Sequence, residues 1–124
     1  MGIAVDLNTE VFDLTLALQS VGGDGEFLAE IAGLVQAAWP TLLADLKEGV
    51  ARGDLRTVKQ RARLAKAAAR NVSARRTYDC ALELETMTGK GDLRASEVAI
   101  ARLEHEAKLL QSALSKIRNL GYEA

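Results

Sequence analysis

The sequence predicts an all-α fold, with a short first helix near Thr9–Gln19 and four longer helices near 25–52, 54–74, 76–88 and 92–119. Apolar residues recur every three or four positions through the long segments, which is the period of a helix packed on one face. No window shows the sustained alternation of a strand, and the 124 residues include only two Phe, two Tyr and one Trp. The length fits a single domain over residues 1–124.

Three apolar stripes are expected to meet in the core of a helical bundle. They are Phe27, Ile31, Leu34, Val35, Ala38, Leu42, Leu46 and Val50; Val58, Ala62, Ala65, Ala69 and Val72; and Ile100, Leu103, Ala107, Leu110, Leu114 and Ile117. Pro40 removes one backbone hydrogen bond from the first of these helices. Because the stripe continues in phase past Pro40, we expect a kink rather than a break. Trp39 is expected to be a packing residue.

Short turns separate the predicted helices. In three of them a glycine that can end one helix precedes an aspartate that can cap the next, at Gly23-Asp24, Gly53-Asp54 and Gly91-Asp92. Turns of this length join antiparallel neighbours, so consecutive helices are expected to run in opposite directions.

One predicted helix is basic on an otherwise acidic protein. The formal net charge is −1, yet residues 55–78 hold eight of the sixteen basic residues and no acid. At about 100° per residue, five of these bases fall within an arc of roughly 80° beside the apolar stripe. They form a basic ridge of Arg56, Lys59, Arg63, Lys66 and Arg70.

Two interpretations of the basic ridge are open. Acids on neighbouring helices would neutralise it; the candidates are Glu83, Glu85, Glu97, Glu104 and Glu106. Without such partners, the ridge would attract an anionic surface.

The segment Ala62–Ala74, ARLAKAAARNVSA, resembles the phosphorylation-site helix of histidine phosphotransfer (HPt) domains. The positions that match the family pattern are Ala62, Lys66, Asn71, Val72, Ser73 and Ala74. Ala67 replaces the usual glycine, and Arg63 stands where the family has its reactive histidine. Further landmarks are similar in order and spacing from about Leu7 to Leu114.

This resemblance implies an up-and-down antiparallel four-helix bundle that exchanges phosphate with an aspartate of a receiver domain. Lys66 would match the lysine that holds the phosphoryl oxygens. Arg63 stays protonated and has no free lone pair, so it cannot accept a phosphoryl group. We therefore expect no catalytic residue, and a module that docks on a response-regulator receiver domain or a sensor histidine kinase. The expected contact residues are Arg56, Lys59, Arg63, Lys66, Ala67 and Arg70.

Two other uses of residues 56–70 remain as alternatives: binding nucleic acid, and forming a dimer. A pI near 5.9 and the absence of aromatic residues from 55–77 argue against nucleic acid. The sequence leaves both a monomer and a homodimer open.

Other chemistries find little support. His105 lies about 200° from Leu103 on the last helix, so we expect an exposed surface residue. One histidine and one cysteine, Cys80, cannot supply a zinc site, and no glycine loop has the spacing that cradles phosphates, so no cofactor is expected. No run approaches the roughly 20 apolar residues of a membrane span. Together with the single cysteine, this predicts a cytoplasmic protein without membrane association.

Overall fold

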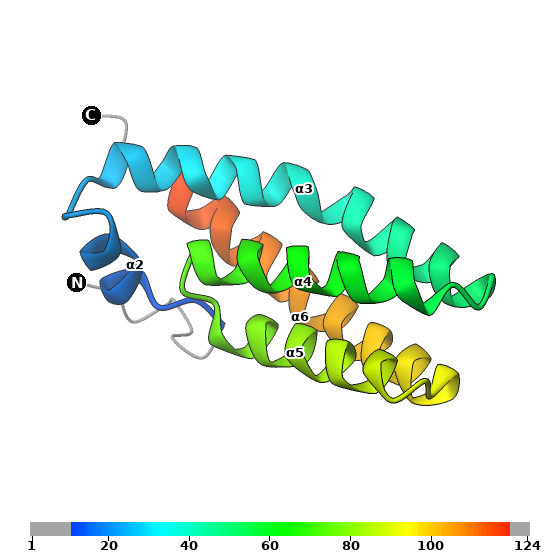
Figure 1. Ribbon diagram of the computed structural model, residues 1–124. Coiled ribbons are helices and arrows are strands. Elements are labelled where there is room, and N and C mark those ends of the chain that lie inside the picture. Colours follow the sequence, from blue (N-terminus) through cyan, green and yellow to red (C-terminus); the bar gives the residue numbers. More distant parts are fainter. Residues whose placement is uncertain (1–10, 120–124) are drawn as a thin grey trace.

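The computed structural model describes residues 11–119, with side chains up to residue 117, and confirms the all-α prediction for that part of the chain. Its helices are α2 (Leu14–Ser20), α3 (Gly25–Ala51), α4 (Leu55–Asn71), α5 (Arg75–Gly89) and α6 (Leu93–Asn119). The long helices form a bundle in which α3 and α5 each pack against both α4 and α6 (Figure 1). The short helix α2 packs against α3, at the end of the bundle where α4 leads into α5.

Glycine and aspartate form the predicted turns. Gly53 and Gly91 adopt φ values of 69° and 74°, in the left-handed region that glycine enters without steric cost. The aspartate after each glycine then caps the following helix: Asp54 accepts from the Thr57 backbone N–H at 3.2 Å, and Asp92 accepts from that of Ala95 at 2.9 Å. Asp24 does the same for α3.

Two helix boundaries differ from the predicted ones by more than one residue. The predicted start at Thr9 lies outside the described residues, and α2 begins at Leu14 because Asp13 caps it. The prediction that the basic helix reaches residue 74 is wrong: α4 ends at Asn71. Ser73 takes a left-handed φ of 56°, which no helix residue can adopt, and its carbonyl accepts from the Asp13 backbone N–H at 3.2 Å.

The stripes of α4 and α6 are buried as predicted. The α3 stripe is correct at Val35, Leu42, Leu46 and Val50, which are buried. It is wrong at Phe27 and Leu34, which are 50% and 72% exposed, and at Ala38, which is also exposed. Leu28, Ala32 and Trp39 are fully buried in their place, so the core-facing side of α3 is rotated by about one residue from the predicted one. The expectation that Trp39 is a packing residue is confirmed.

By length and composition alone, α3 is apolar enough to cross a membrane. Its buried residues include Leu28, Trp39 and Leu46, which face the core of the bundle. A helix that fills such a position needs the same apolar character.

The helix α3 continues through Pro40, so the expectation that proline does not break it is confirmed. Proline has no N–H to donate to the carbonyl of Gln36, one turn earlier. Gln111 of α6 donates its side-chain Nε2–H to that carbonyl at 3.0 Å. In return, Nε2 of Gln36 donates to the Gln111 carbonyl at 3.0 Å. A side chain of α6 thus compensates for the donor that proline lacks.

Candidate functional site

The outer side of α4 carries the basic ridge. The side of α4 next to the ridge is buried through Val58, Ala62, Ala65 and Ala69, which fixes the rotation of the helix. As a result Arg56, Arg63 and Arg70 are exposed, whereas Lys59 and Lys66 are half-buried. Ala67 is exposed between Arg63 and Arg70, and its small methyl group gives little steric cover to its neighbours.

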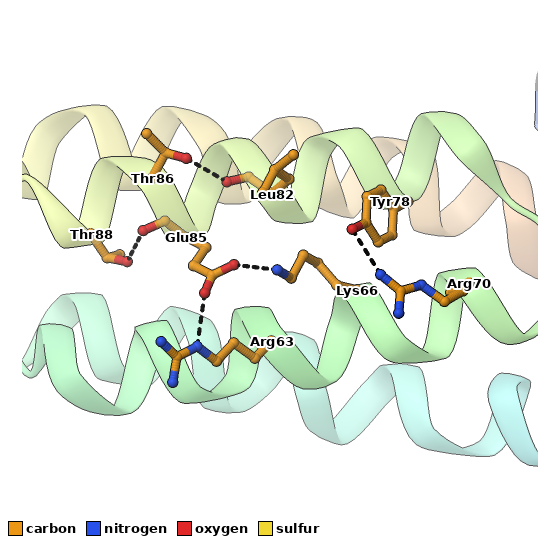
Figure 2. A network of polar contacts seen from close by, with 8 residues as sticks. All are labelled: Arg63, Lys66, Arg70, Tyr78, Leu82, Glu85, Thr86 and Thr88. Atoms are coloured by element: carbon orange, nitrogen blue, oxygen red, sulfur yellow. Dashed lines mark hydrogen bonds and ion pairs between the residues drawn. The ribbon is translucent and has the colours of Figure 1, made fainter.

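Glu85 of α5 binds the two central cations of the ridge. Its Oε2 atom accepts from Nε of Arg63 at 2.8 Å, and its Oε1 atom lies 2.5 Å from Nζ of Lys66. Figure 2 shows the carboxylate pointing from α5 towards α4, with one oxygen directed to each cation. The exposed fractions of the side chains differ: 59% for Arg63, 21% for Lys66 and 16% for Glu85. Glu85 and Lys66 therefore lie between the helices, and Arg63 lies at the surface.

The two cations also change the acidity of Glu85. Hydrogen bonds from Lys66, and secondly from Arg63, lower the pKa of the Glu85 carboxyl below its usual value of 4.5. Glu85 is thus a carboxylate at neutral pH, and it holds Lys66 and Arg63 by charge-assisted bonds.

Only Nε of Arg63 is bonded to Glu85. No described residue accepts a hydrogen bond from the two terminal nitrogens, and one of them points away from the carboxylate in Figure 2. The terminal nitrogens form the edge of an arginine that binds carboxylates and phosphates through two parallel hydrogen bonds. Position 63 therefore presents a pair of donors to an incoming anion.

Arg70, at the far end of the ridge, is held by an aromatic residue. Its Nη2 donates to the hydroxyl oxygen of Tyr78 at 3.0 Å, and its guanidinium carbon lies 5.3 Å from the centre of the ring. Both residues line a shallow groove of about 350 Å³ together with Leu16 of α2. The sequence analysis missed Tyr78 because this residue belongs to the next helix. Its position one turn into α5, close to the turn that follows α4, was the signal that it could contact Arg70.

The prediction that acids neutralise the ridge holds for one of the five candidates. Glu85 bonds to it, but Glu83 bonds to Arg102, Glu104 to Lys47 and Glu106 to Arg76, away from the ridge. Glu97 is exposed on α6. Among residues 11–117, no carboxylate pairs with Arg56, Lys59 or Arg70. One negative charge of Glu85 thus faces two positive charges at the middle of the ridge, and the two ends have no described carboxylate partner.

The other reactive side chains lie elsewhere. His105 is exposed on α6, as predicted. Cys80 is half-buried in α5, where loss of hydration and the nearby Glu106 raise the pKa of its thiol. Within residues 11–119, no three His, Cys, Asp or Glu side chains come together as a metal ion would require.

Comparisons with family models, with curated proteins and with solved structures found no match to this chain. What the protein does must therefore be inferred from the residues around Arg63 and from their geometry. The informative features are a guanidinium held by Glu85 at the centre of α4, a lysine held beside it by the same carboxylate, and cations at both ends of the ridge that pair with no described carboxylate.

Proposed function

We propose that this protein is a non-catalytic, HPt-like module of a two-component phosphorelay. It docks on a response-regulator receiver domain or a sensor histidine kinase and accepts no phosphate at position 63. The observation that carries the proposal is the presentation of Arg63. This residue occupies the position that matches the family's histidine, is 59% exposed, and is held through Nε, while no described residue binds its terminal nitrogens.

The contacts between helices support an up-and-down antiparallel arrangement of α3, α4, α5 and α6. In every packed pair of helices, the residue number in one helix rises as that of its contact in the other falls. The contacts are Asp45–Arg61 and Gly49–Val58 between α3 and α4, Arg63–Glu85 and Arg70–Tyr78 between α4 and α5, Arg76–Glu106 and Glu83–Arg102 between α5 and α6, and Gln36–Gln111 and Lys47–Glu104 between α3 and α6. This is the topology that the HPt resemblance implies.

The chemistry at position 63 favours binding over transfer. A phosphoryl acceptor must offer a lone pair, and a protonated guanidinium has none. A receiver domain accepts its phosphate in an acidic pocket, so an exposed guanidinium is complementary to that pocket. Lys66 keeps the family's position but is engaged by Glu85 at 2.5 Å. The face is thus suited to hold a partner and leave its phosphate where it is.

A binding experiment with matched variants tests this proposal. The wild-type protein, immobilised, is offered a panel of receiver domains and sensor-kinase catalytic domains, and the bound fraction is measured. We expect at least one partner to bind, with binding lost in Arg63→Glu and kept in Arg94→Glu. Arg94 is the control because it is also exposed, on α6. Absence of any partner, or equal binding of both variants, would contradict the docking proposal.

The second part of the proposal concerns phosphate. Incubation of the wild-type protein with a phosphorylated receiver domain is expected to leave no acid-labile phosphate on the chain. Appreciable label on the wild type would show that another residue accepts phosphate, and His105 would be the first to substitute.

An apolar strip on α3 favours self-association as a second candidate function. Asp45 bonds to Arg61 at 2.9 Å, which identifies the side of α3 that faces α4. Phe27, Leu34 and Ala38 precede Asp45 by 18, 11 and 7 positions, so they lie within about 20° of that side. All three are exposed. If the strip joins two copies of the chain, light scattering should show a dimer for the wild type and a monomer for Leu34→Glu. A monomeric wild type would exclude self-association.

A further inference from the structure

The three exposed arginines of α4 form a regular row. Arg56, Arg63 and Arg70 are spaced by seven residues, which is about 20° short of two full turns and rises about 10.5 Å per step. The row therefore runs almost parallel to the helix axis. Gln60 and Ala67, both exposed and uncharged, stand between the arginines, so the row reads in alternate steps of four and three.

Alternate steps of four and three are the spacing with which one helix packs along another. A helix beside α4 repeats its own side chains at the same rise, so carboxylates seven residues apart would meet each arginine in turn. An extended strand repeats one face about every 6.8 Å, which does not match the spacing of the row.

The charges of the row are available to a partner. No carboxylate among residues 11–117 pairs with Arg56 or Arg70, and Glu85 occupies only Nε of Arg63. The hydrogen bond of Arg70 to Tyr78 orients its guanidinium and leaves the charge uncompensated. The row thus presents three positive groups, two of them held in place by residues of α5.

A second copy of this chain does not supply the matching row. The acids of the described long helices are Glu26, Glu30, Asp45 and Glu48 in α3, Asp79, Glu83 and Glu85 in α5, and Glu97, Glu104 and Glu106 in α6. Only Glu97 and Glu104 are seven residues apart, and Glu104 is bound to Lys47. No described helix offers three carboxylates at this spacing, which favours a different protein as the source of the complement.

We infer that the row Arg56, Arg63 and Arg70 is the docking face for a helix of a partner protein that carries carboxylates at every seventh position. This inference rests on the docking part of the proposed function and names the element that would be bound. It does not depend on the partner's being a phosphorelay protein.

Designed peptides test the inference. Two alanine-rich helical peptides of about 20 residues carry three glutamates each, either seven residues apart or five residues apart, the latter about 140° from one another. Their helicity is matched by circular dichroism. Binding to the full chain is followed at low salt by the amide shifts of 15N-labelled protein, which detect weak association. We expect the peptide with glutamates seven residues apart to bind about tenfold more tightly than the other peptide and to shift the amide signals of residues 56–70.

The variants sharpen this comparison. The double substitution Arg56→Gln with Arg70→Gln should abolish the preference between the peptides, and Arg94→Gln should retain it. Each of three outcomes would overturn the inference. They are equal affinity for the two peptides, no change in the amide signals of α4, and tighter binding of a DNA duplex than of the peptide with glutamates seven residues apart. If a receiver domain binds but the two peptides bind equally, the proposed docking function is upheld and the inference of a helical partner is rejected. If the peptides differ but no receiver domain or sensor kinase binds, the helical partner is upheld and the phosphorelay function is rejected.

Discussion

Glu85 binds Arg63 through a single nitrogen, with 2.8 Å between Oε2 and Nε. A carboxylate that paired with the terminal nitrogens would occupy the binding edge of the guanidinium, whereas this one leaves it open. Glu85 is therefore a positioning residue for Arg63. The same carboxylate fixes Lys66, so its removal releases two cations at once.

The Glu85→Gln substitution should lower stability in a pH-dependent way. Because the pKa of Glu85 is lowered in the folded protein, its contribution is fully present above its usual pKa of 4.5 and is lost as pH falls through the folded value. We expect a loss of about 1–2 kcal/mol in the free energy of unfolding at pH 7 that shrinks at acidic pH. Urea unfolding from pH 7 to 3 measures it. Glu83→Gln, in an exposed pair with Arg102, should cost less; a gap independent of pH would contradict the assignment.

Replacing Arg63 by histidine should restore an acceptor of phosphate. The imidazole supplies the missing lone pair on an exposed position of α4, with Lys66 one turn away. We expect acid-labile phosphate on Arg63→His after incubation with a phosphorylated receiver domain, and more of it when Ala67→Gly is added, because the glycine removes a methyl group beside the site. Arg56→His, on the same row, is the control and should stay unlabelled.

The bond from Gln111 to the Gln36 carbonyl should matter only while residue 40 is proline. Gln111→Ala removes the donor at 3.0 Å and should cost about 1–3 kcal/mol, because the carbonyl is partly buried. In a Pro40→Ala background the backbone N–H of residue 40 takes over, so the same substitution should cost clearly less. Denaturant unfolding of the four proteins gives the coupling energy; additive losses would show that proline is not the cause.

A methyl group at position 49 should destabilise the contact between α3 and α4. A Cβ atom on Gly49 would lie 2.8 Å from Cγ2 of Val58, which is fully buried. We expect Gly49→Ala to cost about 1–3 kcal/mol and Val58→Ala to recover part of the loss. Gly89→Ala is the matched control, since its Cβ would meet only Nζ of Lys59 at 4.0 Å. Thermal unfolding distinguishes the two substitutions.

The sequence predicted the helices of the bundle better than the orientation of α3. The stripes of α4 and α6 are the only apolar sides of their helices, so their period identifies the buried side. The first half of α3 is apolar on more than one side, so the period alone cannot tell whether Leu28 or Phe27 faces the core. The packing of Trp39 in the core fixes the rotation of the helix and buries Leu28. The end of α4 was missed for a different reason, because Ser73 takes a left-handed conformation that usually belongs to glycine.

The site was predictable in part. Helical geometry alone places Arg56, Arg63 and Arg70 on one exposed side of α4. The choice of Glu85 over Glu83 as the partner of the ridge depends on which neighbour each side of α5 faces, since Glu83 turns to α6 and bonds Arg102. Likewise, the bond between Arg70 and Tyr78 depends on how closely α4 and α5 approach at their shared turn.

Trp39 gives the protein a built-in optical probe. It is the only tryptophan of the chain, it is fully buried, and its indole N–H has no hydrogen-bond partner in the described structure. Its fluorescence should be blue-shifted in the folded protein and move to longer wavelength on unfolding. Because Trp39 points into the core and the arginines of α4 point to solvent, emission reports whether a variant is folded and stays silent when a ligand meets the surface.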